Sequence, residues 1–311
     1  MNAPLILTRR LLCSLLIAAN LASGADDWEK LPSIPVPCGG FAAGVHGGRI
    51  WLLGGTNWEG GVKNWLRTSF AFHPDRLEWT QLPDLKEPAA YGLAIHSADG
   101  LTIIGGSDGK RPLLSIDGQP DHVVLSSGGK LGSQIILVGG TNDAANLAGI
   151  TKSAFAIAER QVTKLPDYPG QPVAVAAHCV HGDELLMFGG LNYDSKSALP
   201  VNTNSAFAYS ASKTAWRSLA PLPEARRGLS AVNFGDGRVY LAGGYGADFS
   251  ASAWIYDIKS NSYSPAKPLP YAGMVGLVIH GSFLYCLGGE DKMKSRTDRC
   301  FRIPTAALSK P

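Results

Sequence analysis

The chain has 311 residues, a formal net charge of +3 and lysines and arginines dispersed along its length. A basic stretch of the kind that holds nucleic acid is therefore not indicated, and we expect no nucleic-acid partner. None of the 5 cysteines stands in a CxxC or Cys/His spacing typical of zinc sites. We therefore expect no metal bound through cysteine.

The first element along the chain is a candidate secretory signal in residues 1–25. Arg9 and Arg10 precede an apolar run from Leu11 to Ala22, and small residues follow it. The run is shorter than the about 20 apolar residues that span a bilayer. Because these two arginines are the only charged residues of the segment, its removal takes the formal charge from +3 to +1. We expect a mature protein that begins near Asp26, is periplasmic or secreted, and has no membrane attachment.

Self-similarity dominates residues 26–311. Six Gly-Gly pairs each close an apolar stretch, and they fall 51, 34, 50, 54 and 45 residues apart. This spacing is near the roughly 50-residue period of kelch repeats. One unit shows four short strand-like segments with turn residues between them: Gly228 to Phe234, Val239 to Gly244, Trp254 to Ile258, and Tyr263 to Pro270. The repeats predict an all-β fold.

The two ends of the chain complete each other in this pattern. The last unit has no fourth segment, whereas Trp28 to Pro32 has the signature of a fourth strand with no unit before it. We therefore predict that this N-terminal strand pairs with the last unit and closes a ring, which removes exposed sheet edges. The expected fold is a single domain over residues 26–311, a six-bladed kelch-type β-propeller closed by an N-terminal outer strand.

The second unit is shorter than the others. It leaves room for a third strand around Pro112 to Gly118, and the next first strand is expected at His122 to Ser127. We therefore expect the second blade to lack its outermost strand.

Loops that join second to third strands should gather on one face of the propeller, together with the connections between blades. Polar and aromatic side chains expected there are Asn57, Trp58, Lys63, Asp108, Arg111 and Arg227. Glu290 and Arg296 stand out, because only the last of the Gly-Gly pairs is followed directly by an acid, and an arginine lies in the same loop. A funnel of this composition suits a polyhydroxylated ligand. A solvated loop residue is the alternative for each of them, and an exposed ion pair for the last two.

The histidines give no catalytic signature. His96, His181 and His280 end first strands, and His178 lies within one, so a hydrogen-bonded structural role is favoured for each. The sequence shows no Ser-His-Asp order, phosphate-binding glycine loop or dinucleotide fingerprint.

Three stretches resemble the kelch-type N-acetylneuraminate epimerases (sialic acid mutarotases), and in particular their circularly permuted group: Gly54 to Trp65, Tyr91 to Gly109, and Gly288 to Asp298. In that family a Gly-Glu is followed, six residues after the glutamate, by Arg-Thr; this glutamate and arginine are the proposed active-site pair and match Glu290 and Arg296. The resemblance implies an isomerase that interconverts the anomers of N-acetylneuraminic acid or a similar acidic sugar, a small-molecule partner, without a cofactor.

The resemblance also implies roles for the pair. Glu290 would take the proton of the anomeric hydroxyl and later act as an acid, as general acid–base catalysis requires. Arg296 would hold the sugar carboxylate through two parallel charge-assisted bonds.

Two other classes of protein stay open. One is a non-catalytic carbohydrate- or protein-binding propeller, because a fold does not fix a function. The other is a copper radical oxidase, which requires a Tyr/His copper site and a thioether-forming cysteine near a tyrosine. Cys286 follows Tyr285, but neighbouring strand residues point to opposite faces. Cys286 and Cys300 are expected on adjacent strands, either bridged or as two buried thiols.

Overall fold

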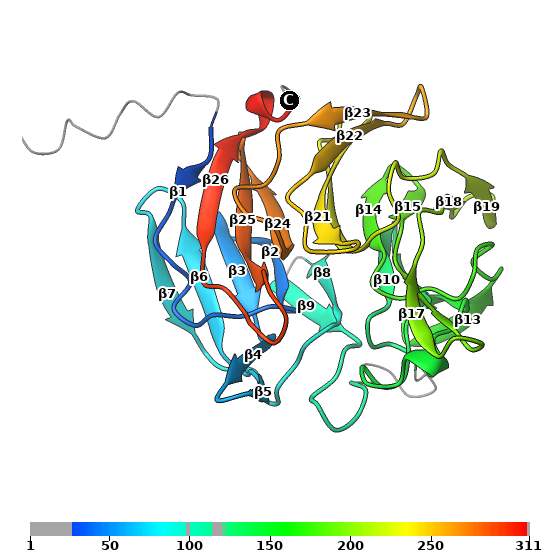
Figure 1. Ribbon diagram of the computed structural model, residues 1–311, viewed down its shortest axis with the longest axis horizontal. Helices are drawn as coiled ribbons and strands as arrows, with labels where there is room; N and C mark the ends of the chain where they lie inside the picture. Colours follow the sequence, from blue (N-terminus) through cyan, green and yellow to red (C-terminus); the bar gives the residue numbers. More distant parts are fainter. Residues whose placement is uncertain (1–26, 98–99, 114–119, 121, 310–311) are drawn as a thin grey trace, which may run out of the picture.

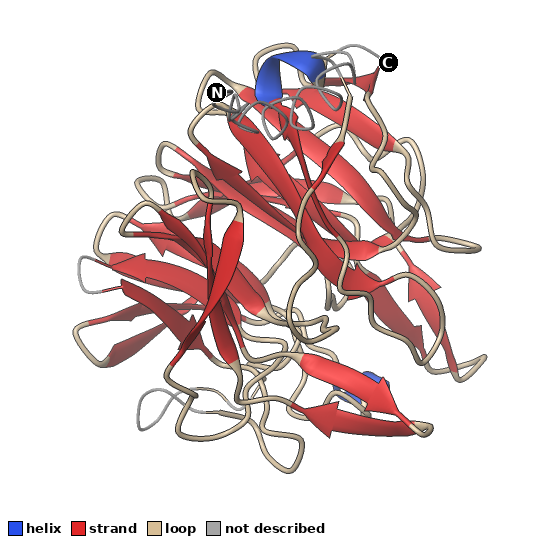
Figure 2. Cartoon of the chain, turned by 90° about the vertical axis from the view of Figure 1, so that its left-hand side faces the viewer, coloured by secondary structure: helices blue, strands red, loops and turns tan. Residues whose placement is uncertain are grey.

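The computed structural model describes residues 27–97, 100–113, 120 and 122–309, and the predicted signal in residues 1–25 lies outside these ranges. Strands and the loops between them make up nearly all of the described chain (Figure 2), which confirms the all-β prediction. The helices in this part are single turns of 3-10 helix, η1 (Leu147–Gly149) and η2 (Thr305–Ala307). No helix found there has the length and apolar character to cross a membrane.

Five antiparallel sheets of four strands surround a central axis (Figure 1), and their first strands line it. Each blade is named here by its first strand. The strands of each blade are given from the axis outward. The β2 blade has β2 (Ala42–His46), β3 (Arg49–Leu53), β6 (Ser69–His73) and β7 (Glu78–Leu82), and the β10 blade has β10 (Ser127–Leu131), β11 (Gln134–Val138), β12 (Ala154–Ala158) and β13 (Gln161–Leu165). The β14 blade has β14 (Ala177–His181), β15 (Glu184–Phe188), β18 (Ala206–Ser210) and β19 (Ala215–Ser218); the β20 blade has β20 (Arg227–Asn233), β21 (Arg238–Tyr245), β22 (Ala253–Asp257) and β23 (Ser262–Ala266); and the β24 blade has β24 (Met274–His280), β25 (Phe283–Glu290), β26 (Cys300–Pro304) and β1 (Glu29–Lys30).

The prediction of six blades is wrong, because the described chain forms five. The described residues of the second unit form a single two-stranded sheet, β8 (Leu93–Ser97) with β9 (Gly100–Ile104), between the β2 and β10 blades. Where a third strand was expected, Pro112 makes an isolated bridge to Ser107, and residues 114–119 lie outside the described ranges. The next first strand begins at Ser127, beyond the predicted start at His122. Gly105-Gly106 and Gly139-Gly140 are only 34 residues apart, which is too short a segment to supply the third and fourth strands of a blade.

Two further hairpins project between second and third strands. They are β4 (Thr56–Glu59) with β5 (Val62–Trp65) in the β2 blade, and β16 (Leu191–Asp194) with β17 (Leu199–Asn202) in the β14 blade.

The Gly-Gly pairs join each unit to the next. In every pair the N–H of the second glycine donates to a backbone carbonyl at the entry of the following unit, at 2.8 Å. The first glycine has a positive φ, and a Cβ there would meet that same oxygen at 2.0–2.8 Å, so only glycine fits. The donor–acceptor pairs are Gly55–Ala89, Gly106–Val123, Gly140–Val173, Gly190–Arg226, Gly244–Gly273 and Gly289–Cys38.

The predicted ring closure by the N-terminal strand is confirmed. β1 pairs with β26 in antiparallel register, with Glu29 opposite Arg302, and these two side chains form an ion pair at 2.6 Å. The chain that follows packs inward, because Leu31 and Ile34 are 3% and 2% exposed. Its backbone continues the pairing, since the Leu31 N–H donates to the Cys300 carbonyl at 2.9 Å.

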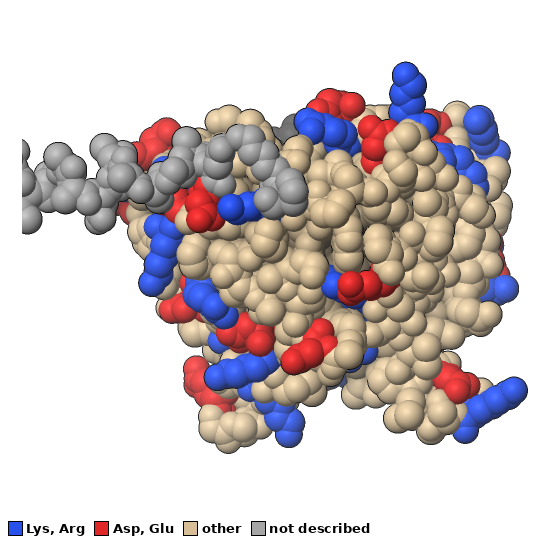
Figure 3. Space-filling model, turned by 45° about the horizontal axis from the view of Figure 1, so that its top comes forward, with Lys and Arg blue, Asp and Glu red and all other residues tan. Residues whose placement is uncertain are grey.

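The hydrophobic core lies between neighbouring blades. Between the β14 and β20 blades, for example, the rings of Phe188 and Tyr256 are both fully buried, with centroids 5.2 Å apart. Acidic and basic groups are interspersed on the face seen in Figure 3. The four cysteines of the described chain are free thiols; Cys286 lies opposite Phe301, and Cys300 opposite Leu287.

A backbone belt frames one end of the central channel. It consists of Gly40, Tyr91, Leu125, Val175 and Gly228, which all have positive φ values between 54° and 68°. Each of the last four donates its N–H to the carbonyl of the residue before it in this order, at 2.8–3.0 Å. A left-handed conformation costs a non-glycine residue about 1–3 kcal/mol. The belt bonds between units hold these residues in that conformation.

Candidate active site

Two adjacent cavities lie on the propeller axis, and the belt residues line both of them. The central channel, of about 770 Å³, is bounded by the inner strands of all five blades and by β8. The mouth cavity, of about 340 Å³, lies at the belt end and is lined by Lys63, Arg227, Glu290 and Arg296. Half of the eight residues expected at a ligand site therefore come together in one cavity.

The loop between β25 and β26 positions Glu290 and Arg296. Glu290 is the last residue of β25, and the Thr297 N–H donates to the Gly289 carbonyl at 3.0 Å, which folds the loop back on the strand end. Nη1 of Arg296 lies 3.1 Å from Oε2 of Glu290. The side chains are 5% and 19% exposed, respectively. An ion pair this sheltered is screened less by salt than a surface pair.

The Arg296 guanidinium is fixed from several sides. Nη1 also donates to the Ser295 carbonyl at 2.7 Å, and Nη2 donates to the Tyr91 hydroxyl at 3.3 Å. Its Nε is buried without a hydrogen-bond partner among the described residues. The stem passes over Gly39, where a Cβ would lie 2.6 Å from the arginine Cδ. Glycine at this position leaves room for the arginine to reach its partners.

Tyr91 connects Arg296 to the β4–β5 hairpin. Its hydroxyl lies 3.2 Å from Oγ1 of Thr56, and the Lys63 ammonium sits 4.7 Å from the centre of its ring. Burial by itself would raise the pKa of the Tyr91 hydroxyl, but the charges of Lys63 and Arg296 outweigh it and lower this pKa. Tyr91 therefore has a more acidic hydroxyl than a free tyrosine.

Arg227 enters the mouth cavity from the start of β20. Its guanidinium stacks over the Tyr245 ring at 4.4 Å, and Nη1 donates to Oδ1 of Asn202 at 2.8 Å. Asn202 is held in turn, because its Nδ2 donates to the carbonyls of Tyr245 and Gly246 at 3.1 and 3.2 Å. Burial lowers the pKa of Arg227, and the neighbouring Tyr245 and Glu290 partly oppose this effect.

The other four expected site residues do not line either cavity. Asn57 is buried in β4 and accepts a hydrogen bond from Asn64 at 3.0 Å, and Trp58 is its neighbour in that hairpin. Asp108 and Arg111 close their own turn with an ion pair at 3.6 Å. Burial by itself would raise the pKa of Asp108. The backbone N–H groups of Lys110 and Arg111, together with the Arg111 charge, outweigh burial and hold this pKa below its usual range.

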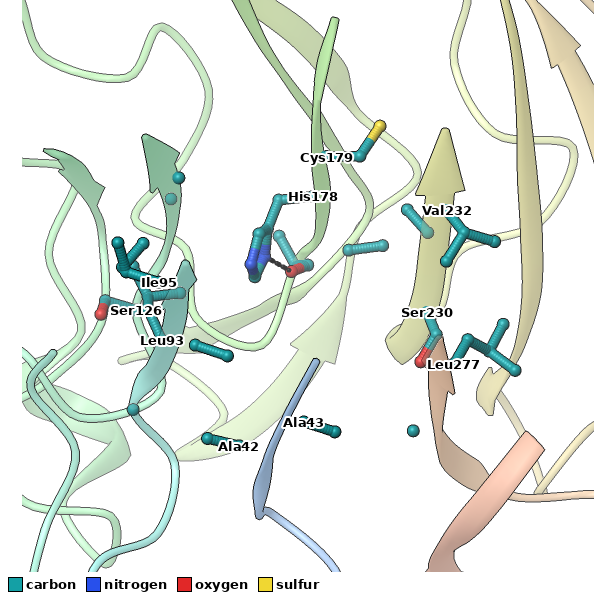
Figure 4. A pocket seen from close by; sticks show the side chains of 18 of the residues that line it. Ala42, Ala43, Leu93, Ile95, Ser126, His178, Cys179, Ser230, Val232 and Leu277 are labelled. Carbon is teal, nitrogen blue, oxygen red and sulfur yellow. Dashed lines mark hydrogen bonds between the residues drawn. The ribbon is translucent and has the colours of Figure 1, made fainter. Parts of the chain in front are cut away.

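His178 projects into the channel (Figure 4). Its Nδ1–H donates to the Ala176 carbonyl at 3.1 Å, which matches a hydrogen-bonded structural role. Burial lowers its pKa, against the effect of that bond, so the ring is neutral at physiological pH. In the part of the chain that the structure describes, no three His, Cys, Asp or Glu side chains gather as metal ligands would.

Sequence reasoning missed Tyr91 and Asn202. Tyr91 precedes a first strand, and in an alignment of the units it occupies the place of Gly228, next to Arg227. Tyr91 and Gly228 both come from connections between units that lead to the channel mouth, so this alignment was the sequence signal that could have identified Tyr91. No sequence signal marked Asn202, which contacts Arg227 only in the folded ring.

Fold and motif comparisons agree on the class of protein. The kelch motif model matches residues 37–86 and 226–270. The solved structure of YjhT superimposes with a TM-score of 0.68 at 14% identity, covering 87% of this chain and 95% of YjhT, which shows a likeness of fold. The chain is a kelch-type β-propeller.

The curated relatives include two kinds of protein. Kelch-like protein 36 of Mus musculus is 23% identical over 300 residues, which cover 88% of this chain and 47% of that protein. An N-acetylneuraminate epimerase of Salmonella paratyphi B is 26% identical over 178 residues, which cover 45% of this chain and 46% of the epimerase. The chain thus spans about half the length of these relatives.

Proposed function

We propose that this protein is a cofactor-independent mutarotase that interconverts the anomers of N-acetylneuraminic acid or a similar acidic sugar. The observation that carries the proposal is the ion pair of Glu290 with Arg296, at 3.1 Å, in a cavity sized for one sugar. Glu290 is the only carboxylate among the described residues that line this cavity. The likeness to the Salmonella epimerase supports the substrate class.

The proposed chemistry needs one group that both accepts and gives a proton. The Glu290 carboxylate accepts the proton of the anomeric hydroxyl. As the bond from the anomeric carbon to the ring oxygen breaks, the carboxylic acid gives that proton to the ring oxygen, and the open-chain ketone forms. Rotation about the bond between the carbonyl carbon and the ring carbon next to it, followed by reclosure, yields the other anomer by the reverse transfers.

The charges around Glu290 favour an acidic ligand. Lys63, Arg227 and Arg296 face the cavity with Glu290, which leaves two positive charges in excess. In a partly dry cavity this excess attracts an anion more strongly than it would in water. A sugar carboxylate fits such a site, and an uncharged sugar gains less from it.

A non-catalytic binding propeller is the second candidate. The match to Kelch-like protein 36 over 88% of this chain favours it, because that match extends beyond the part shared with the epimerase. The discriminating property is the role of Glu290, which a mutarotase needs for turnover and a binding module needs only for affinity.

A proton NMR time course tests the proposal. Freshly released α-N-acetylneuraminate is followed with the purified protein, without it, and with the Glu290→Gln variant. We expect the wild-type protein to speed the approach to the anomeric equilibrium and the variant to lose most of that effect. Identical time courses with and without the wild-type protein would favour the binding module.

A further inference from the structure

Of the two arginines that line the mouth cavity, Arg227 has more N–H donors to spare. Only one of the five N–H groups of an arginine is used here, by Asn202, among the described residues. No acidic side chain of the described chain forms an ion pair with it. Asn202 and the Tyr245 ring fix the guanidinium plane, so its remaining donors are already oriented.

By comparison, the terminal nitrogens of Arg296 already have hydrogen-bond partners within the protein. Nη1 has two partners, Glu290 and the Ser295 carbonyl, and Nη2 has Tyr91. Its Nε is buried against Gly39, where a ligand would have to displace backbone. A carboxylate could therefore engage both terminal nitrogens of Arg296 only by displacing Glu290 or the Ser295 carbonyl from Nη1.

The surroundings of Arg227 also favour an anion. The side chain is partly buried, and burial lowers its pKa, which means that lost hydration is not fully replaced by protein partners. A carboxylate that accepts two parallel bonds would replace that hydration. Arg227 and Glu290 line the same cavity, so a ligand held by one lies within the space of the other.

We propose that Arg227 receives the carboxylate of the ligand, and that Arg296 is a positioning residue that holds Glu290. The inference rests on the proposed function for the identity of the ligand. In N-acetylneuraminic acid the carboxylate is bonded to the anomeric carbon. A grip on the carboxylate by Arg227 therefore also fixes the carbon whose hydroxyl Glu290 deprotonates.

The test compares binding and turnover in matched variants. Calorimetry measures the binding of N-acetylneuraminate and of its methyl ester, which lacks the negative charge, to the wild-type protein and to Arg227→Gln, Arg227→Lys and Arg296→Lys. Arg111→Gln is the control, because Arg111 is an arginine of the same face outside both cavities. Circular dichroism verifies that each variant is folded.

We expect Arg227→Gln to weaken N-acetylneuraminate binding by about 10- to 100-fold, the effect of losing charge-assisted hydrogen bonds. Arg227→Lys keeps the charge but loses the forked guanidinium, so its affinity for N-acetylneuraminate should lie between those of the wild type and Arg227→Gln. Binding of the methyl ester should change little in either variant. Arg296→Lys should lower kcat more than it raises KM.

Other outcomes overturn the inference. It fails if Arg227→Gln binds N-acetylneuraminate as the wild type does, if both probes weaken equally, or if the wild-type protein does not bind N-acetylneuraminate. The proposed function can fail separately, because binding that depends on Arg227 without any anomer interconversion would refute the mutarotase and support the carboxylate site.

Discussion

The Tyr91 hydroxyl lies 3.3 Å from Nη2 of Arg296, although 205 positions separate the two residues in the sequence. Tyr91 comes from the second unit and Arg296 from the last, so this bond crosses the place where the ring closes. Because Nη1 of the same guanidinium holds Glu290, the closure of the ring determines where the carboxylate stands. Contacts far from Glu290 in sequence are therefore expected to influence its chemistry.

Replacement of Glu290 by glutamine should abolish most of the proposed catalysis. The amide keeps the shape of the carboxylate but cannot accept the proton, and general acid–base catalysis typically contributes about 10²–10⁴-fold. We expect the enzymatic anomerisation rate to fall by about that factor while N-acetylneuraminate binding is largely retained. The NMR time course and calorimetry measure the two effects.

Glu59→Gln is the control, because Glu59 is an exposed acid of the β4–β5 hairpin outside the mouth cavity. A Glu290→Gln variant with the wild-type rate would refute the proposed mechanism.

Removal of the Tyr91 hydroxyl should loosen Arg296. Tyr91→Phe keeps the ring under Lys63 but removes the bonds to Arg296 and Thr56. A hydrogen bond contributes about 0.5–1.5 kcal/mol, so we expect kcat to fall roughly 3- to 10-fold with a smaller change in KM. Steady-state kinetics of the variant beside Tyr193→Phe, which lies outside both cavities, measures this split. An unchanged kcat would show that Glu290 does not depend on this contact.

The N-terminal strand should contribute to the stability of the whole ring. Leu31 is 3% exposed in the core between the first and last blades, and a buried Leu→Ala change costs about 2–5 kcal/mol. Urea unfolding of Leu31→Ala should show that loss. Lys30→Ala is the control, since Lys30 is the exposed last residue of β1, next to Leu31, and its replacement should change stability by less than about 0.5 kcal/mol. Equal midpoints for the two variants would contradict the closure.

The buried thiols should make the protein less stable in alkali. Burial raises the pKa of Cys38 and Cys286, and the partial burial of Cys179 raises its pKa, to about 12 each, against about 8.5 in an unfolded chain. The folded state therefore keeps the proton that the unfolded state loses, so stability is complete below about pH 8.5 and falls as the pH rises toward about 12. Each thiol contributes a slope of up to about 1.4 kcal/mol per pH unit in that window.

Urea midpoints at about pH 8 and about pH 10 measure this slope. Cys179→Ala should reduce the slope of stability against pH by the contribution of one thiol. A slope that this substitution leaves unchanged would show that Cys179 ionises equally in both states.

The sequence by itself determined where neighbouring units of the propeller contact each other and how the ring is closed. Each Gly-Gly pair marks a place where the backbone of one unit touches the carbonyl of the next, and no side chain fits there. Because this steric demand is local and recurs, it is visible as a repeat. Glu290 and Arg296 were predictable for the same reason, since one short loop holds both.

Only the tertiary structure decided the number of blades and the composition of the mouth cavity. A repeat period counts units but not the strands that pair in each, and the second unit has too little chain for a full sheet. Asn57 and Trp58 share a hairpin with Lys63, yet only Lys63 faces the cavity, because its side chain reaches over the Tyr91 ring. Arg227, Asn202 and Tyr245 meet across two blades. Such contacts depend on the angle at which rigid blades pack around the axis, which no local pattern encodes.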